Sequence, residues 1–247
     1  MSSDSLFTTM AGLQAITASM QALSSNLANT ATTGYQAVQI ATEADPYSGS
    51  NAPSGADTTA LTPNPDIAPG PLTQTGDPLD VAVGGDAWLQ VQTAHGTALT
   101  RDGSLQVTNE GILADGAGNP VLSAGGQPIS VPSVTKLTIG ADGTVSGTLA
   151  SQPNAAPQSF GQIGLVATPG GLLTPISGTL FSPPAGAALQ PATNGSLHQG
   201  YLNQSNVDAT QAMMDLINES RSYQLQTTML KTQSTNNDAL NTLLTQG

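Results

Sequence analysis

Charged residues are scarce in this sequence of 247 residues, and basic residues are the scarcest. Asp, Glu, Lys and Arg make up 8% of the chain, whereas an average globular protein has roughly a quarter. The net charge is −12, and the first of the four basic residues is Arg101. An acidic chain is repelled by nucleic acid and by anionic membrane surfaces, so we expect no nucleic-acid partner.

Cysteine is absent, and the sequence has no long apolar run. The lack of cysteine excludes a disulfide framework, a thiolate nucleophile and a Cys-ligated metal. No stretch approaches the roughly 18 apolar residues of a membrane span, so the chain is not expected to cross a membrane. The amino terminus has neither a basic segment nor the apolar core of a cleaved signal peptide. We therefore expect a protein that stays in the cell or leaves it through a dedicated export machine.

Residues suited to catalysis are few and lie in turn-like contexts. His95 and His198 each stand near a glycine, and their spacing does not fit a metal site. Asp77 and Asp80 flank a Pro-Leu pair and could be read as an acid/base pair, but Asp before Pro is common in turns. Residues 115–119, "DGAGN", lack the repeated acidic ligands of a calcium loop. The sequence predicts no catalytic, cofactor-binding or metal site, and no enzyme.

The first thirty residues carry a heptad pattern that predicts a helix from about residue 5 to 29. Apolar residues recur alternately three and four positions apart, with one polar member, Thr9. Such a helix is about 37 Å long at 1.5 Å per residue. No residue in this range is charged, so salt bridges cannot select its partner. The apolar positions, which we expect to form an assembly interface, are Leu6, Leu13, Ile16, Met20, Leu23 and Leu27.

A second heptad pattern at the carboxyl end predicts a helix from about residue 207 to 244. Its expected interface residues recur at multiples of seven positions and are Leu216, Tyr223, Leu230 and Leu244. Most intermediate positions are polar, so one such seam is a weak coiled coil that needs more than one neighbour. Two core helices of a globular domain would show a similar pattern. Terminal position and the lack of a charged outer face favour helices covered by other subunits.

The residues between the two helices alternate apolar and polar side chains in short runs. Turn pairs such as Asp102-Gly103 and Asp142-Gly143 punctuate these runs every 8 to 12 residues, a pattern typical of antiparallel hairpins. The sequence thus predicts an α+β fold with a coiled-coil-like pair of terminal helices and a central, mainly antiparallel β domain. The expected segments are 1–35 (amino-terminal helix), 36–75 (extended connector), 76–191 (β domain), 192–206 (return connector) and 207–247 (carboxy-terminal helix).

The segment "SNLANTATTGYQ", residues 25–36, is unusual for the end of a helix. Asparagine and threonine side chains can bond free backbone groups, and a glycine allows a turn without strain. The residues that form the motif are Asn26, Leu27, Ala28, Asn29, Thr32, Gly34 and Tyr35. The motif resembles the signature of flagellar rod, hook and hook-associated proteins. Gln36 stands where that family usually has Lys or Arg.

Two further segments carry the same resemblance. Residues 76–107 are similar to the start of the family's middle β domain, and residues 200–226 to its carboxy-terminal motif. The resemblance implies a structural subunit of the basal-body rod that assembles axially through its terminal helices to transmit torque. It also implies self-assembly with other rod subunits and passage through the flagellar type III export apparatus, without a cleaved signal. No cofactor is implied.

The size of the β domain narrows the position within the rod. About 115 residues are too many for the smallest proximal subunits and too few for the hook protein. The Trp88-Leu89 pair and the short connector after Tyr35 favour a proximal over a distal rod subunit. Two alternatives remain, a distal rod subunit and a secreted β-sandwich binding or adhesion module.

Overall fold

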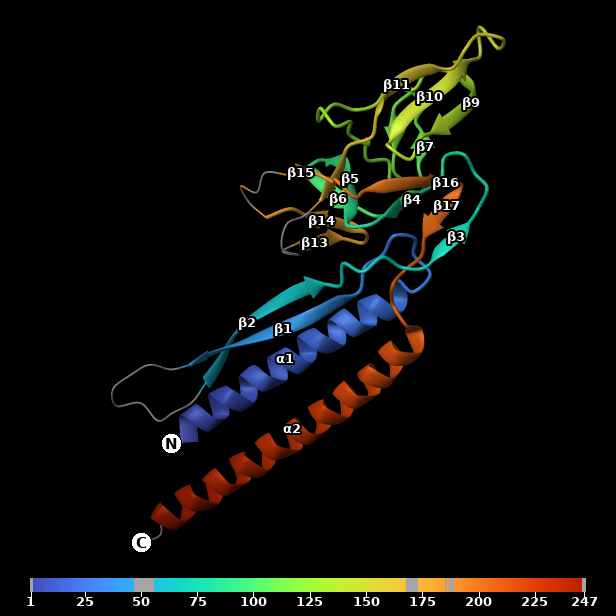
Figure 1. Cartoon of the computed structure of the whole chain (residues 1–247). Coiled ribbons are helices and arrows are strands. Elements are labelled where there is room, and N and C mark those ends of the chain that lie inside the picture. Colours follow the sequence, from blue (N-terminus) through green and yellow to red (C-terminus); the bar gives the residue numbers. More distant parts are fainter. Residues whose placement is uncertain (1, 47–55, 168–172, 185, 187–188, 246–247) are drawn as a thin grey trace. The chain divides into compact units, whose positions relative to one another are not determined.

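The computed structural model describes residues 2–46, 56–167, 173–184, 186 and 189–245 (Figure 1). The chain forms two compact units. We call residues 1–28, 38–64 and 208–247 the helical unit, and residues 29–37 and 65–207 the β unit. The α+β fold class is confirmed.

Two long helices dominate the helical unit. They are α1 (Ser2–Ala28) and α2 (Ala209–Thr245), close to the predicted ranges 5–29 and 207–244. Asp208 caps α2, because its Oδ1 accepts hydrogen bonds from the N–H groups of Thr210 (2.8 Å) and Gln211 (3.1 Å). Neither helix, over its described residues, is apolar enough along its length to serve as a membrane span.

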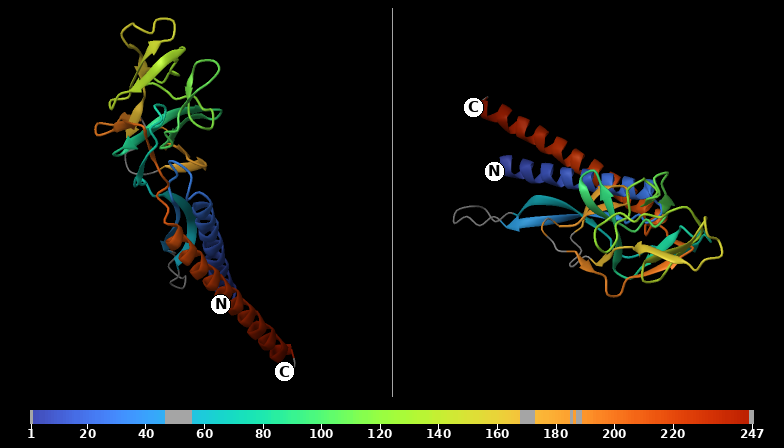
Figure 2. Two further views of the ribbon diagram at one scale, coloured as in Figure 1. Left: turned by 90° about the vertical axis from the view of Figure 1, so that its right-hand side faces the viewer. Right: turned by 90° about the horizontal axis from the view of Figure 1, so that it is seen from above.

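The helical unit also contains a two-stranded sheet. Strands β1 (Val38–Pro46) and β2 (Ala56–Pro65) pair with each other. Both fall within residues 36–75, which the sequence predicts as an extended connector. Strand β1 lies beside α1 (Figures 1 and 2).

The β unit consists of short strands joined mostly by tight turns. In chain order they are β3 (Leu72–Gln74), β4 (Val81–Gly84), β5 (Ala87–Thr93), β6 (Gly96–Thr100), β7 (Gln106–Val107), β8 (Leu113–Ala114), β9 (Val134–Ile139), β10 (Thr144–Leu149), β11 (Gln158–Gln162), β12 (Leu165–Ala167), β13 (Thr174–Ser177), β14 (Leu180–Ser182), β15 (Gln190–Pro191), β16 (Ser196–Gln199) and β17 (Tyr201–Asn203).

Antiparallel pairing builds two larger sheets from these strands, as predicted. One has the order β13-β14-β6-β5-β12-β15, and the other has the order β11-β10-β9. The pairs β16-β4, β17-β3 and β7-β8 are separate. The predicted turn at Asp142-Gly143 joins β9 to β10, and Gly143 has φ +87°, which favours glycine.

The core of the β unit lies on both faces of β5. Leu89 and Val91 point into the larger apolar cluster, together with Val81, Leu113 and Val145. Trp88, between Ala87 and Leu89, enters a second cluster with Leu99, Val166, Leu173 and Phe181. Trp88 is a core residue, since only 1% of its surface is exposed. Strand β5 is therefore buried on both faces and lies between the two apolar clusters of the β unit.

Candidate assembly surfaces

Helices α1 and α2 lie side by side and run in opposite directions (Figures 1 and 2). Ser19 on α1 donates a hydrogen bond from Oγ to Oε1 of Glu219 on α2, at 3.3 Å. Seven residues earlier on α1, Gly12 lies against the side chain of Gln226, seven residues later on α2. A step back on one helix therefore matches a step forward on the other, as an antiparallel pair requires.

The predicted interface residues are only half covered within this chain. Leu13, Ile16, Met20, Leu23 and Leu27 of α1 are all half-buried. On α2, Leu216 and Leu230 are half-buried, and Tyr223 is 41% exposed. The side chains of Leu6 and Leu244 lie outside the described residues. Among the described side chains of the two helices, only Asn26 and Ala212 are buried.

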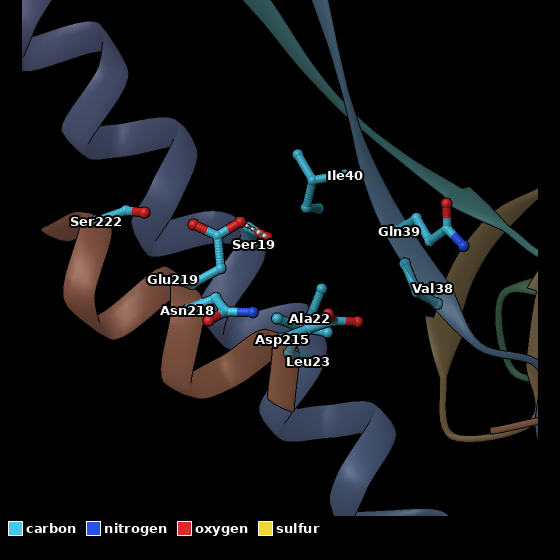
Figure 3. A pocket seen from close by; sticks show the side chains of 10 residues that line it. All are labelled: Ser19, Ala22, Leu23, Val38, Gln39, Ile40, Asp215, Asn218, Glu219 and Ser222. Carbon is cyan, nitrogen blue, oxygen red and sulfur yellow. Dashed lines mark hydrogen bonds between the residues drawn. The ribbon is translucent and has the colours of Figure 1, made fainter. Parts of the chain in front are cut away.

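A groove with a volume of about 330 Å³ lies where α1, α2 and β1 meet (Figure 3). Ala22 and Leu23 of α1 and Val38 and Ile40 of β1 give it an apolar side. Helix α2 contributes only polar side chains, namely Asp215, Asn218, Glu219 and Ser222. The groove is therefore apolar on one wall and acidic on the other, and we call it the acidic groove.

Helix α2 also carries exposed apolar side chains on the face turned away from α1. Met214, Ile217 and Leu225 are 48%, 52% and 67% exposed, and exposed Arg221 lies between them. Positions 214, 217, 221 and 225 are three or four apart, so they share one face of the helix. We call these four residues the outward stripe. The predicted interface positions Leu216, Tyr223 and Leu230 lie on another face of α2 and do not include the stripe. The available signal was the recurrence of Met214, Ile217 and Leu225 at helical spacing around Arg221.

Asparagine amides hold the chain where it leaves and re-enters the helices. Asn26, 4% exposed, donates from Nδ2 to the carbonyl of Val38 and accepts from the N–H of Val38, both at 2.9 Å. In the β unit, Asn203 makes the same pair of bonds with Val83, at 3.3 Å and 2.7 Å. Each side-chain amide thus bonds both the N–H and the carbonyl of one residue, as a neighbouring strand would. Both side chains bond backbone groups, as the sequence predicts for asparagines of the motif such as Asn26.

The rest of the motif forms a tight turn in the β unit. Thr32 donates from its N–H to the carbonyl of Asn29 (3.1 Å) and from Oγ1 to Oδ1 of Asn29 (3.1 Å). Gly34 has φ +68°, and a side chain there would collide with the backbone of Asp102. The predicted need for glycine is confirmed. Tyr35 follows and is 3% exposed.

Gln36 is fully buried, at the position where the sequence departs from the family pattern. With its amide oriented to satisfy both ends, its nitrogen donates to the carbonyl oxygens of Asp66 (2.9 Å) and Ala68 (3.0 Å). Asn206 joins this cluster by accepting from the N–H of Ala37 at 2.7 Å. The neutral amide of Gln36 donates to these carbonyls without burying the charge that a Lys or Arg would bring.

Arg101 is a buried cation that sequence reasoning did not single out. It is 1% exposed, and its guanidinium stacks over the ring of Trp88, 4.7 Å from the centroid. Nη2 donates to the carbonyl of Gly85 at 3.0 Å. Burial lowers the pKa of Arg101 to about 10, and the nearby charge of Asp86 opposes that shift. The side chain therefore remains protonated at neutral pH and supports the second apolar cluster.

The residues considered for catalysis form ordinary turns and surface positions. Asp77 accepts the N–H of Leu79 at 2.8 Å, as turn chemistry predicts. Asp115 accepts the N–H groups of Ala117 (3.0 Å) and Asn119 (2.8 Å) within its own loop. His95 is exposed in a turn, whereas His198 is exposed on strand β16 rather than in a loop. No group of residues in the described part of the chain could hold a metal ion.

Comparison with known proteins identifies the family. A family model described as "Flagellar basal body rod FlgEFG protein C-terminal" matches residues 198–243, and one described as "Flagellar hook protein FlgE/F/G D1 domain" matches residues 82–147. The flagellar basal-body rod protein FlgF of Escherichia coli K12 is 37% identical over 238 residues, which cover 94% of this chain and 92% of that protein. This chain belongs to the flagellar basal-body rod protein family.

Other relatives place the chain among the FlgF-like members of the rod family. FlgF of Caulobacter vibrioides is 32% identical over 82% of each chain. FlgG of Bacillus subtilis is 36% identical over 168 residues, which cover 64% of this chain and 62% of that protein. The rod family consists of structural proteins, so the adhesion-module alternative is not favoured. The chain is a structural subunit of the flagellar rod.

Proposed function

We propose that this chain occupies the proximal part of the rod and assembles there with other rod subunits through α1 and α2. The supporting observation is the half-covered seam of the helices. Leu13, Leu23 and Leu230 stay half-buried although each helix already packs against the other. Apolar side chains at heptad spacing gain stability only when a further surface covers them.

In this proposal α1 and α2 form the coiled-coil-like inner helical layer of the rod. The predicted residues Leu6, Leu13, Ile16, Met20, Leu23, Leu27, Leu216, Tyr223, Leu230 and Leu244 are its contacts. The motif that contains Asn26 and Gly34 lies where the chain passes from the helical unit to the β unit. Torque is carried by the packed helices.

The proposal includes export through the flagellar type III route and localisation in the periplasmic rod. Scarcity of charge in α1 suits it, because a helix covered on all sides by subunits must not bury unpaired charges. Between residues 5 and 29 there is no charged residue.

The experiment is a count of this chain in isolated basal bodies, by quantitative mass spectrometry against a rod protein of known copy number. A small number of copies at the membrane end of the rod supports the proximal position. A count several-fold higher, distributed along the rod, would identify the distal subunit instead. Absence from basal bodies would overturn the assignment to the rod altogether.

A further inference from the structure

The outward stripe of α2 is an apolar surface with a single positive charge at its centre. Met214, Ile217 and Leu225 surround Arg221, which makes no ion pair with any described residue. Arg221 and Lys231 are the only basic residues in the sequence of the helical unit. A partner for this surface therefore needs apolar side chains and a carboxylate at one position.

The acidic groove of the same unit has these properties. Glu219 uses Oε1 to accept from Ser19, and Asp215 uses Oδ1 to accept from Gln211 at 2.9 Å, which leaves one oxygen of each carboxylate for another donor. Neither carboxylate is paired with a basic side chain in the described part of the chain. Val38 and Ile40 of β1 lie across the groove from these carboxylates, and Leu23 of α1 also lines it (Figure 3).

The stripe and the groove lie on different sides of α2. Ala212, Glu219 and Gln226 mark the side that faces α1, whereas positions 214, 217, 221 and 225 lie opposite them at 3.6 residues per turn. The groove occupies the flank between these sides. A single chain therefore cannot close the contact on itself, and one such contact between two copies uses the stripe of one and the groove of the other.

We propose that a second copy of this chain docks its outward stripe in the acidic groove, with its Arg221 between Asp215 and Glu219. This inference rests on the proposed function and names the partner of the helical surface. The contact is heterologous, so it propagates from copy to copy instead of closing as a two-fold dimer. Because one ion pair lies at its centre, the contact weakens as salt concentration rises.

Thiol cross-linking tests this arrangement cleanly, because the chain contains no cysteine. One variant carries Leu225→Cys in the stripe, and another carries Gln39→Cys on the groove wall. Cells that produce both full-length variants provide basal bodies, which are treated with a short thiol-to-thiol cross-linker. We expect a dimer of this chain from the mixture and none from either variant alone.

Charge exchange tests the ion pair within the same assay. Arg221→Glu in the stripe or Asp215→Arg in the groove, each added to both cysteine variants, is expected to lower the dimer yield by roughly tenfold or more. Adding Arg221→Glu to the Leu225→Cys copy and Asp215→Arg to the Gln39→Cys copy restores the opposite charges and the yield. Lys231→Glu is the matched control, with the same change of charge on the same helix and no expected effect.

Three results would overturn the inference. A dimer from the Leu225→Cys variant alone would mean that two stripes meet. A product that joins the Gln39→Cys variant to a cysteine of another rod protein, in place of the dimer, would name a different occupant of the groove. No product at all, from basal bodies that contain both variants, would show that the two surfaces do not meet, while the proposed function stands because the chain is present in the rod.

Discussion

At the scale of single residues, the buried side-chain amides of two asparagines bond backbone groups that a neighbouring strand would otherwise bond. Asn26 and Asn203 each bond both backbone groups of one distant residue, Val38 and Val83. A serine or aspartate could not donate and accept in the same plane. Spacing alone did not reveal this role of the two asparagines.

Asn203→Ala should therefore destabilise the β unit by about 2 to 4 kcal/mol, because the N–H and carbonyl of buried Val83 lose their partners. The measurement is denaturant unfolding followed by the fluorescence of Trp88, the lone tryptophan. Asn154→Ala, at an exposed position, is the control and should change the free energy of unfolding by less than about 0.5 kcal/mol. Equal stability of the two variants would contradict the role of the amide.

Gln36→Glu tests the buried donor at the start of the connector. A carboxylate there faces the carbonyl oxygens of Asp66 and Ala68, so we expect a loss of about 2 kcal/mol or more at pH 7. The fold should raise the pKa of the new carboxyl, since only its protonated form can donate. The loss should therefore shrink as the pH falls toward the unfolded value of about 4.3.

Gln92→Glu, at an exposed position of β5, is the matched control for that change of charge. Its free energy of unfolding should stay close to that of the parent chain at both pH values. A Gln36→Glu variant that behaved like this control would show that the amide at residue 36 bonds differently.

At the scale of elements, heptad spacing was enough to place both helices, and Gly-punctuated alternation was enough to predict antiparallel strands. Spacing could not say that polar side chains of α2 would meet α1. Glu219 and Gln226 contact α1, and they lie three residues after the apolar positions 216 and 223, on the same face of the helix. Nor could it reveal Arg101, since a lone arginine gives no sign of burial until the strands that surround it are placed.

Leu13→Asp or Leu230→Asp should abolish motility, because each puts an unpaired charge into a seam that we propose other subunits cover, at a cost of several kcal/mol. The unfolding of the β unit, read from Trp88, should hardly change. Ser24→Asp is the control, with the same new charge at an exposed position of α1. Full motility of both leucine variants would show that the seams are not interfaces.

At the scale of the whole molecule, the chain divides its tasks between the helical unit and the β unit. The β unit has closed apolar clusters, with Val81, Leu89 and Phe181 fully buried. The helical unit has half-covered side chains along both helices, so it gains much less stability from its own contacts. The proposed assembly supplies the stability that the helical unit lacks on its own.

Limited proteolysis of the purified monomer should show this difference. We expect early cleavage before about residue 35 and after about residue 205, and a resistant fragment that contains the strands from β4 to β16. Mass spectrometry of the fragments gives the cleavage sites. Uniform resistance of the chain from residue 5 to 244 would mean that the helices are stable without partners.

The central claim is that the half-covered helices incorporate this subunit into the rod. The most direct measurement is the amount of the chain, relative to another rod protein, in basal bodies from cells that produce only the Leu13→Asp variant, or only the Ser24→Asp control. We expect the control at the level of the parent chain and the Leu13→Asp variant below detection, although both are made in equal amounts. Equal incorporation of the two variants would contradict the claim.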